Sequence, residues 1–363
     1  MKYDVIAYCW NDALAGFTRE DAQRLTHVNL AFGLIKDGLL DLHLLKYLHL
    51  LPRLREWNPE MKIVLSVGGW GADGFSDMAM TEEGRRNFAK SCLDAVEKYN
   101  LDGIDIDWEY PCNDAAGIGA DPRDKENFTA LLATLREYLG KDSIVSIAVG
   151  ASQRCIADTQ MDKVAEIVDY VQLMTYDMVD GTRAGHHAAL GATKGDKSGL
   201  NTRDTVEAYR RAGVPYEKII IGAAFYGRHF EVTSFENHGL LQPSGGGLPG
   251  PAYGEITPEY LRENNFQIYW DADAEANYLW NGKTLVSYES PKAVRLKCKY
   301  VKEKKLLGIM YWEHGNDPTR ELLGAIADEI QWDKKLRAAP SGAARCCVIF
   351  PESACRSPRP AMP

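Results

Sequence analysis

The sequence lacks the features of a membrane protein or of a nucleic-acid-binding protein. Its 363 residues contain no apolar run of about eighteen residues, the length that a membrane-spanning helix needs. Acidic residues outnumber basic ones by 51 to 42, and no basic stripe accompanies the formal net charge of −9. We therefore expect neither a membrane nor a nucleic acid as partner.

The first residues, MKYDVIAYCWND, lack the apolar segment behind a basic start that marks a signal peptide. As written, the sequence predicts a cytoplasmic protein. A secreted protein would require that the sequence has been trimmed to its mature start.

Common metal and cofactor motifs are missing as well. The eight cysteines form no CxxC pair, no HExxH occurs, and the adjacent His186 and His187 stand in a Gly-rich stretch typical of a loop. We expect free thiols, no metal and no cofactor.

What the sequence does contain is an alternation of short β-rich runs with helical patterns. Helical spacing of apolar residues is clear at 82–99, 122–139 and 202–212. The eight β-rich runs are 3–8, 27–35, 62–69, 103–110, 143–150, 170–177, 218–227 and 306–312. Eight such repeats predict an α/β fold, a closed (β/α)₈ TIM barrel. An open doubly wound sheet is the alternative, but no Gly-rich phosphate motif follows the first run.

The predicted barrel is interrupted once and extended once. Residues 229–290 are too long for a plain loop and contain strand-like pieces, so they predict a small α+β insertion between strand seven and helix seven. The barrel itself is assigned to 1–228 and 291–333. Residues 334–363 have no periodicity and are rich in Pro, Ala and Arg, which predicts a disordered or non-native tail.

Four acids crowd the stretch LDGIDIDWEYP at 101–111, which otherwise reads as a buried strand. Strand side chains alternate between faces, so Asp105, Asp107 and Glu109 share one face and rise toward the carboxyl end, where barrel active sites lie. Carboxylates this close raise one another's pKa. The pattern predicts a carboxyl group that stays protonated near neutral pH and can act as a general acid.

These residues match a known family pattern. DGIDIDWEYP resembles the DGxDxDxE signature of the family 18 glycoside hydrolases, the chitinases. The family's SxGG motif is similar to Ser66-Val67-Gly68-Gly69, and its MxYD motif to Met174-Thr175-Tyr176-Asp177. The resemblance runs from about residue 3 to 331, and the insertion is similar to that of the bacterial-type branch.

The resemblance implies a substrate-assisted, retaining hydrolysis of chitin or chito-oligosaccharides, in which the sugar's own acetamide is the nucleophile. Glu109 would be the acid and then the base, and Asp107 would bind the acetamide N–H. Asp105 would share a proton with Asp107. Tyr176 would donate to the acetamide oxygen, and Asp177 would hold the distorted sugar.

Aromatic side chains are the expected binding surface, because sugar rings have apolar faces. Trp312 would lie beneath the sugar at the cleavage site, and Trp70 would stack on a sugar of the leaving group. The other predicted substrate contacts are Tyr226, Tyr8, Phe32, Arg228 and Met174. Ser66 would support Asp105, while Gly68 and Gly69 would allow close backbone approach.

Other functions remain open on the sequence alone. The same chemistry could act on an N-glycan core or on bacterial wall glycan, and a carbohydrate-binding lectin is an alternative from another class. The presence of all five predicted catalytic residues favours an enzyme. We expect a monomer.

Overall fold

The structure is a computed structural model that describes residues 3–179 and 181–330. The predicted tail at 334–363 therefore lies outside the described residues. Within the described part of the chain, no helix has the length and apolar character to cross a membrane.

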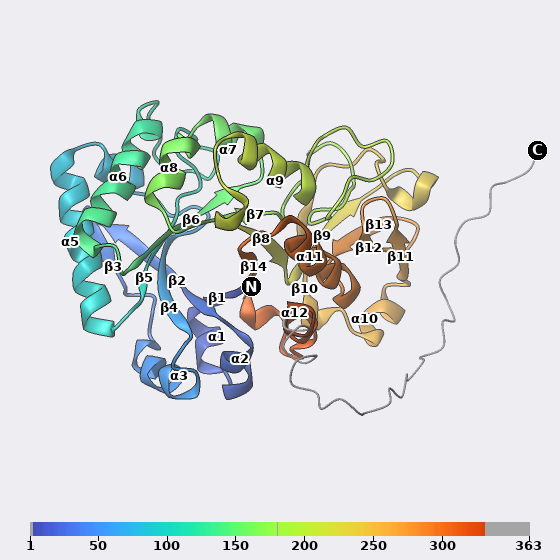
Figure 1. Cartoon of the computed structure of the whole chain (residues 1–363). Coiled ribbons are helices and arrows are strands. Elements are labelled where there is room, and N and C mark those ends of the chain that lie inside the picture. Colours follow the sequence, from blue (N-terminus) through green and yellow to red (C-terminus); the bar gives the residue numbers. More distant parts are fainter. Residues whose placement is uncertain (1–2, 180, 331–363) are drawn as a thin grey trace, which may run out of the picture.

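Eight parallel strands close into a barrel (Figure 1), which confirms the predicted fold class. They are β1 (Asp4–Trp10), β2 (His27–Lys36), β4 (Lys62–Gly68), β5 (Gly103–Asp107), β6 (Ile144–Gly150), β7 (Tyr170–Met174), β8 (Ile219–Ala224) and β14 (Gly308–Trp312). The order is β1-β14-β8-β7-β6-β5-β4-β2, and the β1–β2 pairing closes the ring. A short strand, β3 (Leu39–Asp41), extends β2 as a hairpin.

Helices cover the outside of the barrel (Figure 1). They are α1 (Asn11–Ala15), α2 (Arg19–Arg24), α3 (Leu51–Trp57), α4 (Phe75–Ala79), α5 (Glu82–Tyr99), α6 (Asp124–Leu139), α7 (Gln153–Ala157), α8 (Met161–Ile167), α9 (Thr202–Arg211), α11 (Pro291–Lys304) and α12 (Glu321–Ile330). Helix α5 illustrates the local signals: Thr81 caps its start through Gly84 N–H, and Asn100 ends it in the left-handed region.

The alternation of side chains along each barrel strand divides the core in two. Outward residues such as Ile104 and Ile106 pack under the helices in the larger cluster. Inward residues such as Tyr8, Met174 and Met310 form a smaller cluster inside the barrel. Because inward positions point into a confined interior, an acid placed there is removed from water, which is the setting of Asp105 and Asp107.

The predicted insertion is a five-stranded antiparallel sheet with one helix, α10 (Pro258–Glu263), at one side of the barrel (Figure 1). Its strands are β9 (Tyr226–Glu231), β10 (Leu248–Ala252), β11 (Gln267–Asp271), β12 (Ala276–Trp280) and β13 (Thr284–Tyr288), in the order β10-β9-β13-β12-β11.

The insertion begins earlier than the sequence predicts. The predicted boundary at 229 falls inside β9, because Tyr226 and Arg228 pair with β10 and β13 rather than with barrel strands. Only Phe225 separates β8 from β9. The apolar run at 218–227 conceals this change of sheet, since both strands contain buried residues.

Candidate active site

The predicted acids lie at the carboxyl end of β5. Asp105 stands in register with Ser66 on β4 and with Ser146 on β6. Asp107 is the last residue of the strand, and Glu109 lies two residues past it, in the loop rather than in the predicted strand. The three acids therefore rise from the barrel interior toward its mouth.

Asp105 is fully buried and its two carboxylate oxygens accept four hydrogen bonds. The donors are Tyr8 Oη (2.8 Å), Ser66 Oγ (2.7 Å), Ser146 Oγ (2.7 Å) and Gln172 Nε2 (2.9 Å). Burial raises the pKa of Asp105, while these hydrogen bonds act in the opposite direction. Both oxygens of Asp105 accept from these other donors, and the proton shared with Asp107 stays a prediction.

Asp107 is buried with an exposed fraction of 4%. Its Oδ1 has no hydrogen-bond partner among the described residues. Burial, followed by the charges of Glu109 and Asp105, raises the pKa of Asp107 well above its ordinary value. An acceptor without a donor in such a place is costly, so the site is suited to a ligand that brings one.

Glu109 has the properties of a general acid near neutral pH. Burial raises the pKa of its carboxyl group to about 7; the hydrogen bond from Tyr110 lowers it and the charge of Asp177 raises it. A carboxyl group in that range is protonated often enough to donate a proton and acidic enough to release it.

Tyr176 lies beyond the end of β7 and brings a hydroxyl group to the same region. Its only described hydrogen-bond contact is a weak one, from Oη to Met310 Sδ at 3.9 Å. Burial and neighbouring acids raise the pKa of Tyr176 well above its ordinary value, so the hydroxyl keeps its proton and remains a donor.

Asp177 is held by the insertion. Arg228 donates Nε to Oδ1 (2.6 Å) and Nη2 to Oδ2 (2.7 Å), and Tyr226 donates its hydroxyl to Oδ2 (2.9 Å). His187 Nδ1 lies 3.4 Å from Oδ1. Burial alone would raise the pKa of Asp177, but His187 and Arg228 bring it well below its usual range. Tyr226 and Arg228, predicted as substrate contacts, therefore act on Asp177.

Two glycines of the SVGG segment let the backbone approach the acids. Gly68 has φ +124°, and a Cβ there would lie 2.0 Å from the carbonyl oxygen of Asp107. Gly69 has φ +91°, and a Cβ there would lie 2.6 Å from the Phe32 ring. Any side chain at Gly68 would push on the strand end that carries Asp107.

Replacing Gly68 with alanine is expected to lower the free energy of unfolding by about 3 kcal/mol, because strain and a backbone clash coincide. Gly117→Ala is the control: Gly117 has φ +76° with open space around it, so only strain of about 1 kcal/mol applies. Urea unfolding measures both values. Equal losses would show that close approach to Asp107 is not what Gly68 provides.

An open cleft of about 620 Å³ is lined by Gly68 and Gly69, and Gly69 N–H donates to the carbonyl oxygen of Asp107 at the end of β5. Its walls come from the ends of β1, β2, β4 and β14, and the aromatic members are Trp10, Phe32, Trp70 and Trp312. Trp70 is 65% exposed, and Phe32 stacks on Trp312 with ring centroids 5.3 Å apart. The cleft thus presents indole faces of the kind that pack on sugar rings.

Two predicted contacts differ from the structure. Tyr8 is 2% exposed, and its hydroxyl is directed at Asp105, so it supports the acid instead of offering an open ring face. Met174 is also buried, inside the barrel. Both differences have the same cause. Inward-facing residues that lie deep in the barrel contact other side chains and are not exposed at its mouth.

Sequence reasoning missed several residues of the site. Gln172 and Ser146 reach Asp105 from β7 and β6, and their inward register was the available signal. His187, which the sequence places in a plain loop pair, is fully buried beside Asp177. Trp10 lines the cleft and was not singled out.

A parallel barrel with a protonatable glutamate above two buried aspartates, opening on an aromatic cleft, is the arrangement of a glycoside hydrolase. The chain belongs to the family named Glycosyl hydrolases family 18, whose sequence profile matches residues 4–317.

Relatives of known name support the same assignment. Chitinase A1 of Niallia circulans is 34% identical over 307 residues, which cover 77% of this chain and 44% of that protein. Chitotriosidase-1 of Mus musculus is 31% identical over 83% of this chain and 69% of that protein. A solved family 18 N-acetylglucosaminidase from Paenibacillus barengoltzii is 45% identical, with a TM-score of 0.88, and 90% of this chain covers 99% of that one. This chain thus spans less than half of Chitinase A1.

Proposed function

We propose that this chain hydrolyses β-1,4-linked N-acetylglucosamine chains, chitin or chito-oligosaccharides, with retention at the anomeric carbon. The observation that carries the proposal is a matched pair of polar groups. Asp107 offers a buried acceptor atom that has no donor among the described residues, and Tyr176 offers a hydroxyl whose described partner is a thioether. An acetamide presents one N–H and one C=O, which complement these two groups.

The proposed chemistry uses these groups in the following order. Glu109 gives its proton to the glycosidic oxygen, and the bond from that oxygen to the anomeric carbon breaks. The acetamide oxygen bonds to the same carbon from the other side, giving a cyclic oxazolinium ion whose N–H faces Asp107. Water then attacks the anomeric carbon and gives a proton to the Glu109 carboxylate, while the bond from that carbon to the acetamide oxygen breaks and the acetamide is restored. Two displacements at the same carbon retain the configuration.

Asp107 and Tyr176 contribute orientation and charge. Asp107 aligns the acetamide and stabilises the positive charge that develops on it, in a site shielded from water. Tyr176 fixes the acetamide oxygen near the anomeric carbon, which raises the frequency of reactive geometry. Asp177, held by Arg228 and Tyr226, places a fixed negative charge beside Glu109 and so helps to keep its proton.

Release of single N-acetylglucosamine units is a second candidate. The similar solved structure from Paenibacillus barengoltzii is named an N-acetylglucosaminidase, and it matches this chain over 90% of its length. This candidate keeps the same chemistry and changes only the point of cleavage along the chain.

The test is product analysis on defined N-acetylglucosamine oligomers, with the anomeric form of each new end recorded by NMR. We expect β-anomers first, whether the products are single units or longer pieces, and product length separates the two candidates. The same sugars without N-acetyl groups should resist cleavage. Equal cleavage of deacetylated oligomers, or inverted products, would overturn the proposal.

Two further substrates and a binding-only role are tested alongside. An N-glycan core and a bacterial wall glycan also contain N-acetylglucosamine, so they are incubated under the same conditions. Faster cleavage of either would move the substrate away from chitin. Tight binding of oligomers without any turnover would identify a lectin.

A further inference from the structure

Asp21 is one of the fully buried acids that the mechanism above does not use. Asp21 has no exposed surface, yet it lies on α2, outside the barrel and away from the catalytic acids. A buried carboxylate costs free energy unless it is well paired. Its partners therefore indicate what it does.

Half of the contacts of Asp21 are local. Its Oδ2 accepts from Thr18 N–H (2.9 Å), and its own N–H donates to Thr18 Oγ1 (3.1 Å), which together form a capping box at the start of α2. This role needs only a side-chain acceptor at the position, and it would be satisfied at the surface.

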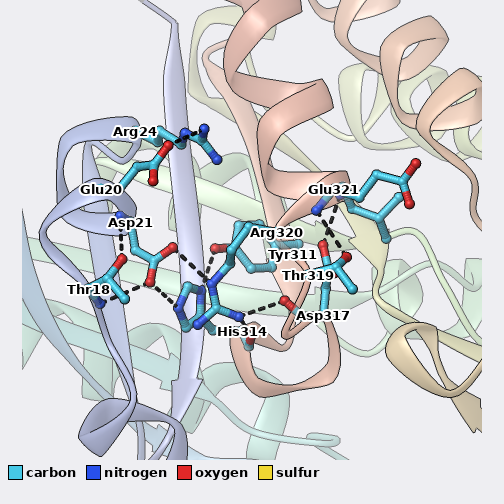
Figure 2. Close-up of polar contacts among 11 residues, drawn as sticks. Thr18, Glu20, Asp21, Arg24, Tyr311, His314, Asp317, Thr319, Arg320 and Glu321 are labelled. Atoms are coloured by element: carbon cyan, nitrogen blue, oxygen red, sulfur yellow. Dashed lines mark hydrogen bonds and ion pairs between the residues drawn. The ribbon is translucent and has the colours of Figure 1, made fainter.

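The other half reaches the opposite end of the chain. Arg320 donates Nε to Asp21 Oδ1 at 2.9 Å, and His314 Nε2 lies 3.4 Å from Oδ2. Figure 2 shows Asp21 on the blue N-terminal ribbon, facing His314 and Arg320 on the orange segment near residue 320. Burial raises the pKa of Asp21, but His314 and Thr18 outweigh it and bring the pKa well below the usual range, so the carboxyl group is ionised.

The segment that Asp21 holds is itself tightly wound. His314 Nδ1 lies 2.9 Å from Tyr311 Oη, and its ring packs on Phe17 at 4.5 Å. Arg320 also donates Nη1 to the carbonyl oxygens of His314 (3.2 Å) and Asp317 (2.6 Å). The turn after β14 is thus one unit around Arg320 (Figure 2).

This unit lies at the seam of the barrel, where the first strand pairs with the last. The first and last strands, β1 and β14, pair only from Asp4 with Gly308 to Ala7 with Tyr311. Past that point each strand pairs with its other neighbour alone, so Trp10 pairs with Ala31, and Trp312 with Ala224. In the described part of the chain, the ladder between β1 and β14 thus ends before it reaches the mouth of the barrel.

Two residues that line the cleft lie where β1 and β14 end. Trp10 and Trp312 stand on opposite sides of the seam with ring centroids 6.3 Å apart, and both line the cleft. Glu313, directly after Trp312, accepts from Trp10 N–H at a long 3.4 Å. The ion pairs of Asp21 with His314 and Arg320 connect the two segments that follow these tryptophans.

We propose that Asp21 is a positioning residue of the substrate cleft: through Arg320 and His314 it fixes the turn after β14 against the segment after β1, and so sets the spacing of Trp312 and Trp10. This inference rests on the proposed function for its kinetic consequence. Its structural consequence, the placement of the two indoles, stands without it.

The kinetic test replaces Asp21 with asparagine, which keeps an acceptor for Thr18 but removes the charge that binds Arg320. We expect kcat/KM on N-acetylglucosamine oligomers to fall about tenfold, mainly through KM. The upper limb of the pH profile of kcat should stay in place, because Glu109 is untouched. Glu20→Gln is the matched control, since Glu20 lies one residue away on α2 and pairs with Arg24 at the surface; it should leave KM unchanged.

A second, smaller change keeps the test valid if Asp21→Asn fails to fold. Tyr311→Phe removes only the hydroxyl beside His314 Nδ1, and it should raise KM in the same direction by a smaller factor, about two- to threefold. If Asp21→Asn or Tyr311→Phe lowers the melting temperature while KM stays at the wild-type value, Asp21 serves stability alone and the inference is wrong.

Acrylamide quenching of tryptophan fluorescence, without substrate, separates this inference from the proposed function. Asp21→Asn should change the quenching of the wild type but have a smaller effect in a Trp312→Phe background, because Trp312 is the reporter. If no oligomer is cleaved by the wild type yet this pattern appears, the proposed function fails and the positioning role holds. An equal change in both backgrounds would overturn the positioning role.

Discussion

Glu109→Gln is expected to lower kcat on chito-oligosaccharides by about 10³-fold or more, while oligomers still bind. The amide keeps the shape and the hydrogen-bonding reach of the side chain, but it has no proton to give to the leaving oxygen. Turnover measured with reducing-end detection, together with calorimetric titration of the oligomer, separates the lost chemistry from retained binding.

The same substitution should also stabilise the protein in a pH-dependent way. The carboxyl group of Glu109 has a pKa of about 7 against an ordinary 4.5. Between these values the unfolded chain releases the proton and the folded chain keeps it, so the wild type loses stability as the pH rises. Glutamine does not titrate, so the variant should gain up to about 3 kcal/mol over wild type at pH 8 and little at pH 4.

Urea unfolding at pH 4, 6 and 8 checks this gain, with Glu97→Gln on the exposed face of α5 as the control for the change of residue type. A variant that keeps near-normal turnover would remove Glu109 from the role of acid. A stability difference that does not change with pH would contradict the raised pKa.

Asp107→Asn is the second substitution with a large expected effect. The asparagine side chain can still meet an acetamide, but it does not carry the negative charge that stabilises the developing oxazolinium ion. We expect kcat to fall by about 10²-fold.

Its pH profile should move as well, and the sign follows from charge. In the wild type the ionised form of each acid is disfavoured by the other, because the Glu109 charge raises the pKa of Asp107 and the interaction is mutual. Without a charge at 107, Glu109 ionises more easily and its pKa falls. The upper limb of the kcat profile should therefore shift to lower pH by about one unit.

Asp94→Asn, on the surface of α5 and paired with Lys90, is the control and should leave both limbs in place. A profile of Asp107→Asn that superimposes on the wild type, after scaling, would mean that the two acids titrate independently.

Much of this fold could be predicted because its signals are local. A buried parallel strand needs a short apolar run, and the eight runs recur with helices between them, so the barrel follows from periodicity. The face shared by Asp105 and Asp107 follows from the two-residue repeat of a strand. Gly68 and Gly69 could be predicted as close-approach positions because glycine in a strand often marks a place where another backbone or a ligand comes near.

The rest depends on contacts between distant parts of the chain. Asp177, just after β7, pairs with Arg228 of the insertion and with His187 of a long loop. Nothing near Asp177 in the sequence indicates these two partners. Asp21 resembles an ordinary helix-capping acid, and only the closed barrel brings Arg320 to it. Tyr8 could not be separated from the cleft aromatics, because exposure depends on depth and not on residue type.

The early start of β9 bears on how this chain could be shortened or recombined. Because the strand that supplies Tyr226 and Arg228 is also the first strand of the added sheet, excising that sheet would leave Asp177 without its cation. The point where the chain leaves the insertion and returns to the barrel, at Glu289, is also fixed. Lys297 of α11 forms an ion pair with Glu289 and donates to the carbonyl oxygen of Gly222. A barrel without the insertion would thus need another arginine to form the ion pair with Asp177 before its active site could be complete.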